Sequence, residues 1–239
     1  MLSNLKIENV LFLDIETVPQ HPDHDSLDET SKKLWEHKAN ILTKGVQTGE
    51  EIYQRAGIYA EFGKIICVSV GFIHVEENNR EYRSRSFFGD DEAKLLTDLA
   101  GMLNSHFNKP QHLLCGHNGK EFDFPYIARR MIINSVKIPR ILQISGLKPW
   151  EVQHLDTMEL WKFGDWKSYT SISLLAHVLG IPTPKDDIDG SDVARVYYED
   201  KDLDRIELYC RKDTLTVAQV LLRMKGEPIL SEDEIIDIT

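Results

Sequence analysis

The chain has 239 residues, of which 41% are hydrophobic and 28% charged, and its formal net charge is −11 at pH 7. The length suits one large domain or two small ones, and the composition is that of a soluble globular protein. We find no apolar run long enough to span a bilayer and no signal peptide at the N-terminus. The acidic charge argues against broad, nonspecific adhesion to nucleic acid, but it leaves room for acids that gather around cations.

The cysteines indicate the redox compartment, and the basic residues indicate surface segments. Cys67, Cys115 and Cys210 share no short spacing, which argues against a disulfide framework or a zinc cluster and favours a reducing cytoplasm. Short basic stretches, among them the pair Arg129 and Arg130, are interpreted as solvated charged faces.

The first third of the chain predicts two strands separated by a helical insertion. Residues 8–16 (ENVLFLDIE) form an apolar run bounded by turn residues, which predicts a buried strand. Residues 18–60 are polar and contain two helical patterns, the first with the capping-box pair Ser26 and Glu29. We expect an insertion or a lid there. Residues 63–75 are rich in β-branched side chains and predict a central strand.

The middle of the chain alternates strands and helices. Residues 80–88 alternate polar and apolar side chains and predict a hairpin partner for the preceding strand. An amphipathic pattern with acids in its first turn predicts a helix over 89–107. A short strand is predicted at 111–118, a helix at 122–136, and a fifth strand followed by a turn at 152–163.

The last third of the chain is predicted to be helical. A helix over 171–180 ends at a glycine with a nearby proline, and two more helices follow over 191–200 and 201–225. We expect the acidic tail, 228–239, to be loose. This order of elements predicts a mixed sheet with helices on its faces, in a single α/β domain over 1–239.

Two acids stand at the end of the first predicted strand. Side chains two residues apart on a strand point to the same face, so Asp14 and Glu16 lie side by side while Ile15 faces the core. Two carboxylates this close repel unless a cation sits between them, and Mg²⁺ takes oxygen ligands of this kind. Either these acids hold a metal ion, or Glu16 and Thr17 merely begin a polar loop.

Two later segments carry further acids. Asp123 stands at the predicted start of a helix, where an acid is also a good capping residue, and the neighbouring Phe122 is of a type that more often packs in a core. Tyr209 and Asp213 are four residues apart on a helix and share a face. They either position a water molecule for a metal site or form an ordinary surface contact.

The four acids together are stronger evidence for a metal site than any one of them alone. Asp14, Glu16, Asp123 and Asp213 would supply four carboxylates at one cleft beside the strand ends. Two divalent ions about 4 Å apart need such a set, and that arrangement serves in-line displacement at phosphorus.

The same segments resemble the three exonuclease motifs of the DEDD superfamily: D-x-E in LFLDIETVP, N-x₄-D in HNGKEFD and Y-x₃-D in YCRKD. The tyrosine makes the chain similar to the DEDDy branch, which contains the proofreading domains of family B DNA polymerases. It looks closest to stand-alone bacterial predicted exonucleases related to that domain. The histidine of the DEDDh branch has no counterpart, because position 208 is leucine. Each motif alone is weak, whereas the ordered set is fairly specific.

The resemblance implies a ribonuclease H-like fold, with a five-stranded mixed sheet, a central first strand and helices on both faces. It implies that Asp14, Glu16 and Asp213 hold one divalent ion, Mg²⁺ or Mn²⁺, and that Asp14 and Asp123 hold a second. Tyr209 would orient the attacking water, and the product would be a nucleoside 5′-monophosphate.

Residues beside the motifs complete the expected site. Asn118, Phe122 and Thr17 are the expected contacts to a substrate, whereas His117 and His154 are interpreted as structural. We therefore expect a metal-dependent 3′–5′ exonuclease that acts on single-stranded nucleic-acid 3′ ends, with DNA favoured over RNA and no membrane partner. The alternative is a catalytically inactive nuclease-like module that binds nucleic acid or a protein partner. Inactive relatives usually lose one or more of the acids. This chain has all four, which argues against the alternative.

Overall fold

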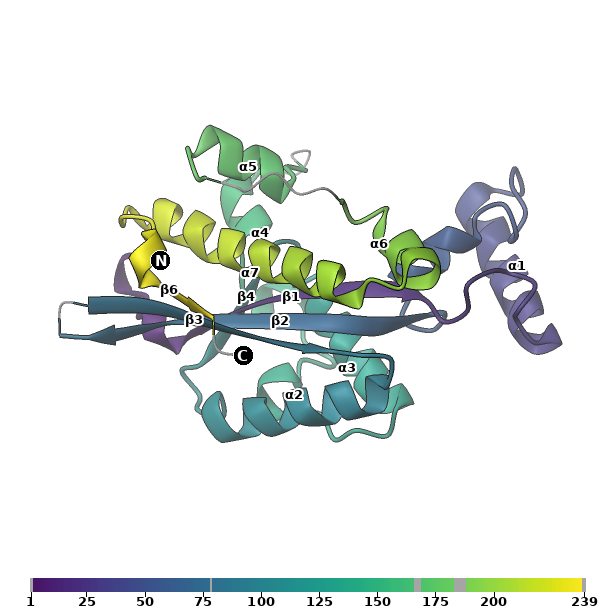
Figure 1. The fold of residues 1–239 in the computed structure, drawn as a ribbon, viewed down its shortest axis with the longest axis horizontal. Coiled ribbons are helices and arrows are strands. Elements are labelled where there is room, and N and C mark those ends of the chain that lie inside the picture. The colour runs from purple at the N-terminus through teal and green to yellow at the C-terminus, as the bar shows by residue number, and fades with distance from the viewer. Residues whose placement is uncertain (1, 78, 166–168, 183–187, 238–239) are drawn as a thin grey trace.

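A six-stranded mixed sheet forms the centre of the computed structural model, which describes residues 2–77, 79–165, 169–182 and 188–237 (Figure 1). The strands lie in the spatial order β5 (Leu155–Asp156), β4 (Leu113–Gly116), β1 (Val10–Pro19), β2 (Gly63–Glu76), β3 (Asn79–Phe88) and β6 (Ile235–Asp237).

The first strand lies inside the sheet, as predicted. β1 pairs antiparallel with β2 and parallel with β4, and β2 continues into the predicted hairpin with β3. β2 therefore covers one edge of β1, β4 covers the other edge at residues 10–12, and helices cover both faces. Leu11, Leu13 and Ile15 pack into the core on one face, and Val10 and Phe12 pack into the core on the other. This burial explains the nearly continuous apolar run in the sequence.

The strand count of five is wrong, because the acidic tail adds a sixth strand. β6 pairs parallel with β3 at the edge of the sheet. A short 3-10 turn precedes it, in which Ser231 and Glu234 form a capping box. Arg80 on β3 then binds Glu234 with a nitrogen–oxygen distance of 2.8 Å. The tail is therefore anchored up to residue 237 rather than loose, and residues 238–239 lie outside the described part of the chain.

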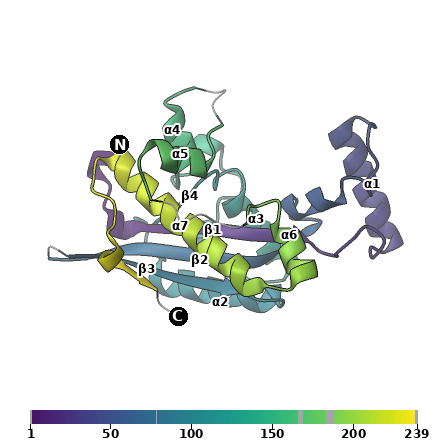
Figure 2. The same cartoon turned by 45° about the horizontal axis from the view of Figure 1, so that its top comes forward.

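Helices cover the sheet on both sides (Figures 1 and 2). α2 (Glu92–His106) and α3 (Asp123–Ile133) lie on one face, and α7 (Leu203–Lys225) crosses the other. α4 (Thr157–Lys162), α5 (Ile172–Val178) and the short α6 (Val193–Arg195), which continues as a π-helical turn to Asp200, lie on the side of α7. Among the described residues, no helix is both long and apolar enough to cross a membrane.

The predicted insertion projects beyond one end of the sheet (Figure 1). Its helix α1 (Glu29–Thr43) begins after Asp28, whose carboxylate accepts hydrogen bonds from two backbone N–H groups of the first turn. The predicted capping role of Ser26 is therefore wrong, and the second helical pattern forms only a 3-10 helix at Tyr53–Ile58. The insertion has a small core of its own around the fully buried Trp35.

Candidate active site

The two acids of β1 lie on the face covered by α7. Asp14 pairs with Ser69 of β2, and Glu16 pairs with Cys67. Ile15 between them packs into the opposite core, against α2 and α3. β1 continues to Pro19, so the alternative in which Glu16 begins a polar loop is wrong. The alternation of the strand thus places both carboxylates under α7, as expected from their spacing.

The long helix α7 brings the third motif against them. Asp213 lies near enough to both Asp14 and Glu16 to raise the pKa of each carboxyl group. Tyr209 stands one turn earlier, and its side chain shares a hydrogen bond with Asp213. Residues four apart on a helix lie one above the other, which explains this contact. Burial raises the pKa of Tyr209, and the nearby acids raise it further, so the phenol stays protonated.

Asp123 approaches the same acids from the other side of the strand. It is the first residue of α3, and its Oδ1 accepts a hydrogen bond from the backbone N–H of Ile15 at 3.2 Å. The residue at the N-cap position is Phe122, which makes no side-chain capping bond. Asp123 is therefore not the N-cap of its own helix. Its carboxylate is instead fixed to β1 between Asp14 and Glu16.

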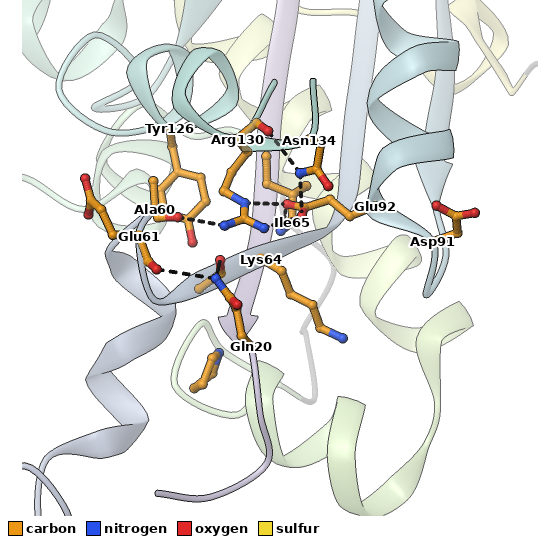
Figure 3. A network of polar contacts seen from close by, with 12 residues as sticks. Gln20, Ala60, Glu61, Lys64, Ile65, Asp91, Glu92, Tyr126, Arg130 and Asn134 are labelled. Atoms are coloured by element: carbon orange, nitrogen blue, oxygen red, sulfur yellow. Dashed lines mark hydrogen bonds and ion pairs between the residues drawn. The ribbon is translucent and has the colours of Figure 1, made fainter. Parts of the chain in front are cut away.

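A buried polar network holds α3 in this position (Figure 3). Arg130, two turns after Asp123, forms an ion pair with Glu92 of α2 in which the side chains are only 5% and 7% exposed. Arg130 also donates to the carbonyl oxygen of Ala60, and Tyr126 donates to that of Gly57. The interpretation of Arg130 as part of a solvated face is wrong. It ties α3 to α2 and to the base of the insertion.

The carboxylates strongly perturb one another. Burial is the largest cause that raises the pKa of Asp14, followed by the charges of Asp123, Glu16 and Asp213. Burial likewise raises the pKa of Glu16, and it raises that of Asp123 to about 7. Negative charges placed this close in a poorly solvated site favour protonation unless a cation neutralises them.

The surroundings of Glu16 fit a bound cation. Glu16 is 8% exposed, and within the described part of the chain nothing donates a hydrogen bond to its carboxylate or forms an ion pair with it. A buried carboxylate without a partner is costly. Ligand atoms of Asp14, Glu16 and Cys210 lie within 4.8 Å of one another. The carboxylate oxygens around this point are ligands of the type that Mg²⁺ and Mn²⁺ prefer, so the residues fit such an ion.

The expected substrate-binding residues are neighbours of the motif acids in the chain. Asn118 has a left-handed backbone with φ of 65°, which asparagine tolerates better than most residues, and its buried Oδ1 has no hydrogen-bond partner. Phe122 packs beside the core with its ring 5.3 Å from that of Tyr126. Thr17 shares a hydrogen bond with the Tyr126 hydroxyl. Asn118 and Phe122 thus flank Asp123, and Thr17 follows Glu16.

The Asn118 loop is held by an acid whose role the motifs did not reveal. Asp156 is 3% exposed and accepts hydrogen bonds from the backbone N–H groups of Asn118 and Lys120, both at 3.0 Å. The same carboxylate caps α4. An aspartate at a helix start is the sequence signal from which the position of Asp156 could have been predicted. A groove of about 1440 Å³ begins at Asn118 and Asp156 and is lined by α3, α4 and residues of the segment between them.

The two histidines near the motifs have structural contacts. His117 Nδ1 and Nε2 contact Thr157 Oγ1 and the Thr170 carbonyl at 2.9 and 2.8 Å. His154 accepts the Leu114 N–H at Nδ1. Burial lowers the pKa of both imidazoles. Neither lies in the carboxylate cluster, in line with their interpretation as structural residues. The residue that the motifs missed in the cluster is Cys210, although its spacing of three from Asp213 placed both on one helix face.

Comparison with solved structures identifies the fold. The chain is similar to the family B DNA polymerase from the hyperthermophilic archaeon Pyrobaculum calidifontis, with 16% sequence identity and a TM-score of 0.50. The similarity covers 89% of this chain and 24% of the polymerase chain, so the protein spans about a quarter of that relative. The expected ribonuclease H-like α/β fold is confirmed, with six strands in place of five.

Comparison of the sequence with known proteins defines the family. The search of curated proteins returned no significant match. Residues 59–233 match the model of a family described as a predicted 3′-5′ exonuclease related to the exonuclease domain of PolB. Asp14 and Glu16 precede the matched range, and the structure places them beside Asp213. Since the match covers well over half of the chain, the protein belongs to this family of predicted 3′–5′ exonucleases.

Proposed function

We propose that the protein is a metal-dependent 3′–5′ exonuclease that removes nucleoside 5′-monophosphates from single-stranded nucleic acid. The observation that carries this proposal is the convergence of four carboxylates from β1, α3 and α7, with the buried Glu16 left without a partner. Family membership supports the reaction class. Similarity to a DNA polymerase supports DNA over RNA as the substrate.

Each acid has a distinct part in the proposed centre. Asp14, Glu16 and Asp213 would hold one divalent ion, and Asp14 together with Asp123 would hold a second. Bound divalent ions would activate the attacking water and neutralise charge on the leaving 3′-oxygen. The hydrogen bond from Ile15 N–H fixes the direction of the Asp123 carboxylate. Backbone contacts and helix packing would thus pre-organise the proposed site for the ions.

Tyr209 and the residues around Asn118 would position the reactants. The Tyr209 hydroxyl, held beside Asp213, would orient the water whose oxygen attacks phosphorus while the bond to the 3′-oxygen breaks. The buried and unpartnered Asn118 Oδ1 is available to accept a hydrogen bond from the substrate. Phe122 and Thr17 would contact the terminal nucleotide. In-line geometry requires that water and leaving oxygen lie on opposite sides of the phosphorus.

The proposal is tested by digestion of labelled oligonucleotides with Mg²⁺ or Mn²⁺. A 3′-labelled strand should release labelled mononucleotide at once, and a 5′-labelled strand should shorten one nucleotide at a time. Asp14→Asn and Asp213→Asn should abolish both. The control is Asp98→Asn, which changes an exposed acid on α2 and should leave the activity unchanged. Matched single-stranded and duplex DNA and RNA substrates define the preferred polymer.

Metal binding separates the enzyme from an inactive module. Calorimetric titration with Mn²⁺ should show uptake by the wild type and much weaker uptake by Asp14→Asn. Folded wild-type protein that takes up no Mn²⁺ and cuts no substrate would refute the proposed enzyme and favour a binding module.

A further inference from the structure

The side chain of Cys210 lies against the carboxylate of Asp14. Its Sγ is 3.4 Å from Asp14 Oδ2 and 3.5 Å from the Asp14 carbonyl oxygen. Both distances suit the long, weak hydrogen bonds that a thiol donates. Cys210 is fully buried on α7, one turn before Asp213, so it enters the cluster from the same helix face as the third motif.

The thiol is the one hydrogen-bond donor that reaches the Asp14 carboxylate from the described residues. Glu16 has none, and Asp123 receives the Ile15 N–H. Asp14 is also the acid whose neighbours include all three of the others. A carboxylate under this repulsion would rotate away from its neighbours unless a contact held it in place.

The surroundings of Cys210 explain why a thiol occupies this position. Its side chain packs in an apolar cluster with Val18, Ile66 and Ile206. A thiol behaves as a small apolar group with a weak donor, so it suits this packing while still donating to Asp14. A stronger cationic donor would pair with Asp14 and compete with a metal ion for it.

We propose that Cys210 is a positioning residue that orients Asp14 for binding of the divalent ion. This inference rests on the proposed function, because it takes Asp14 as a metal ligand. The S–H group holds Oδ2, which restricts rotation of the carboxylate and keeps it beside Glu16. Hydrogen-bonding partners of metal ligands commonly set metal affinity in this way, and their loss weakens binding about 10- to 100-fold.

The test compares Mn²⁺ affinity by calorimetry in the wild type, Cys210→Ala and Cys210→Ser. Cys210→Ala should bind Mn²⁺ at least about tenfold more weakly. Cys210→Ser keeps a donor in the same place and should recover most of that loss. The matched control is Cys115→Ala, which removes another fully buried thiol, on β4, and should bind Mn²⁺ as the wild type does. Thermal unfolding checks the integrity of each variant.

The outcomes separate this inference from the proposed function. The wild type could take up Mn²⁺ and cleave the substrate while Cys210→Ala binds Mn²⁺ with equal affinity. This result would support the proposed exonuclease and overturn the positioning role of Cys210. Equal losses in the alanine and serine variants would also overturn it, because side-chain packing rather than the donor would then matter.

A measurement on the unmutated thiol covers the case in which Cys210→Ala does not fold. The infrared S–H stretching band of Cys210, taken as the difference between wild type and Cys210→Ser, should lie at lower frequency than that of Cys115. It should shift when Mn²⁺ is added. A Cys210 band at the same frequency as that of Cys115, with no shift when Mn²⁺ is added, would overturn the proposal.

Discussion

Replacement of Arg130 by methionine should destabilise the protein strongly. The Arg130 guanidinium donates to Glu92 Oε1 and Oε2 at 2.9 and 2.5 Å, and to the Ala60 carbonyl oxygen at 2.8 Å (Figure 3). Methionine fills a comparable volume but donates no hydrogen bond. Arg130→Met therefore leaves a buried carboxylate without its counter-charge and a carbonyl group without its donor.

The size of the effect follows from the burial of the pair. Glu92 would keep two donors, Ile65 N at 2.7 Å and Asn134 Nδ2 at 2.9 Å, yet it would remain an unpaired buried charge. Removal of one partner from a buried ion pair costs about 3–5 kcal/mol. With a shift of about 2–4 °C for each kcal/mol in a chain of this size, Tm should fall by roughly 10 °C.

Urea denaturation measures the free energy of unfolding against a matched control. Lys94→Met removes the ion pair with Asp98 on the same helix as Glu92, where the side chains are 71% and 46% exposed. Such an exposed pair contributes under about 1 kcal/mol. The double variant Arg130→Met with Glu92→Gln should recover part of the loss, because it removes the unpaired charge. If Arg130→Met loses no more stability than Lys94→Met, the reasoning is refuted.

Two further predictions concern the site, and a third concerns the buried His154. Mn²⁺ at a hundred times its Kd should stabilise the wild type by about 2.7 kcal/mol, measured by thermal unfolding with an EDTA control. Asp14→Asn should not be stabilised by Mn²⁺. In EDTA this variant should unfold at a higher temperature than the wild type, because the substitution removes a repelling charge. A lower Tm in EDTA would contradict this. Tyr209→Phe should lower kcat by about 10²-fold without changing Mn²⁺ affinity by calorimetry, and an unchanged kcat would exclude its water-orienting role. Burial lowers the pKa of His154, so the unfolded chain binds this proton more tightly. The resulting stability is present above the unfolded pKa of about 6.5 and is lost as the pH falls further. His154→Gln should therefore flatten the decline in the free energy of unfolding towards acid pH, and an unchanged slope would contradict this account.

Local patterns predicted most elements of the fold, and two of the misses, β6 and Arg130, share one cause. The strands and the long last helix have regular periods over many residues, which local sequence reveals. β6 has only three residues and depends on pairing with β3 and on the contact between Arg80 and Glu234. Arg130 was misplaced for the same reason, because its partner Glu92 lies 38 residues away in sequence. Contacts of this range leave no trace in a local pattern.

The sequence by itself determined the direction of each functional side chain relative to its own element. The period of two placed Asp14 and Glu16 on one face of a strand, and the helical period aligned Tyr209 with Asp213. Only the tertiary structure decided how these elements meet. It brought Asp123 to the backbone of Ile15 across 108 residues, and it set Cys210 against Asp14. The physical reason is that side-chain direction follows from local backbone geometry, whereas the distance between two elements depends on the packing of the whole core.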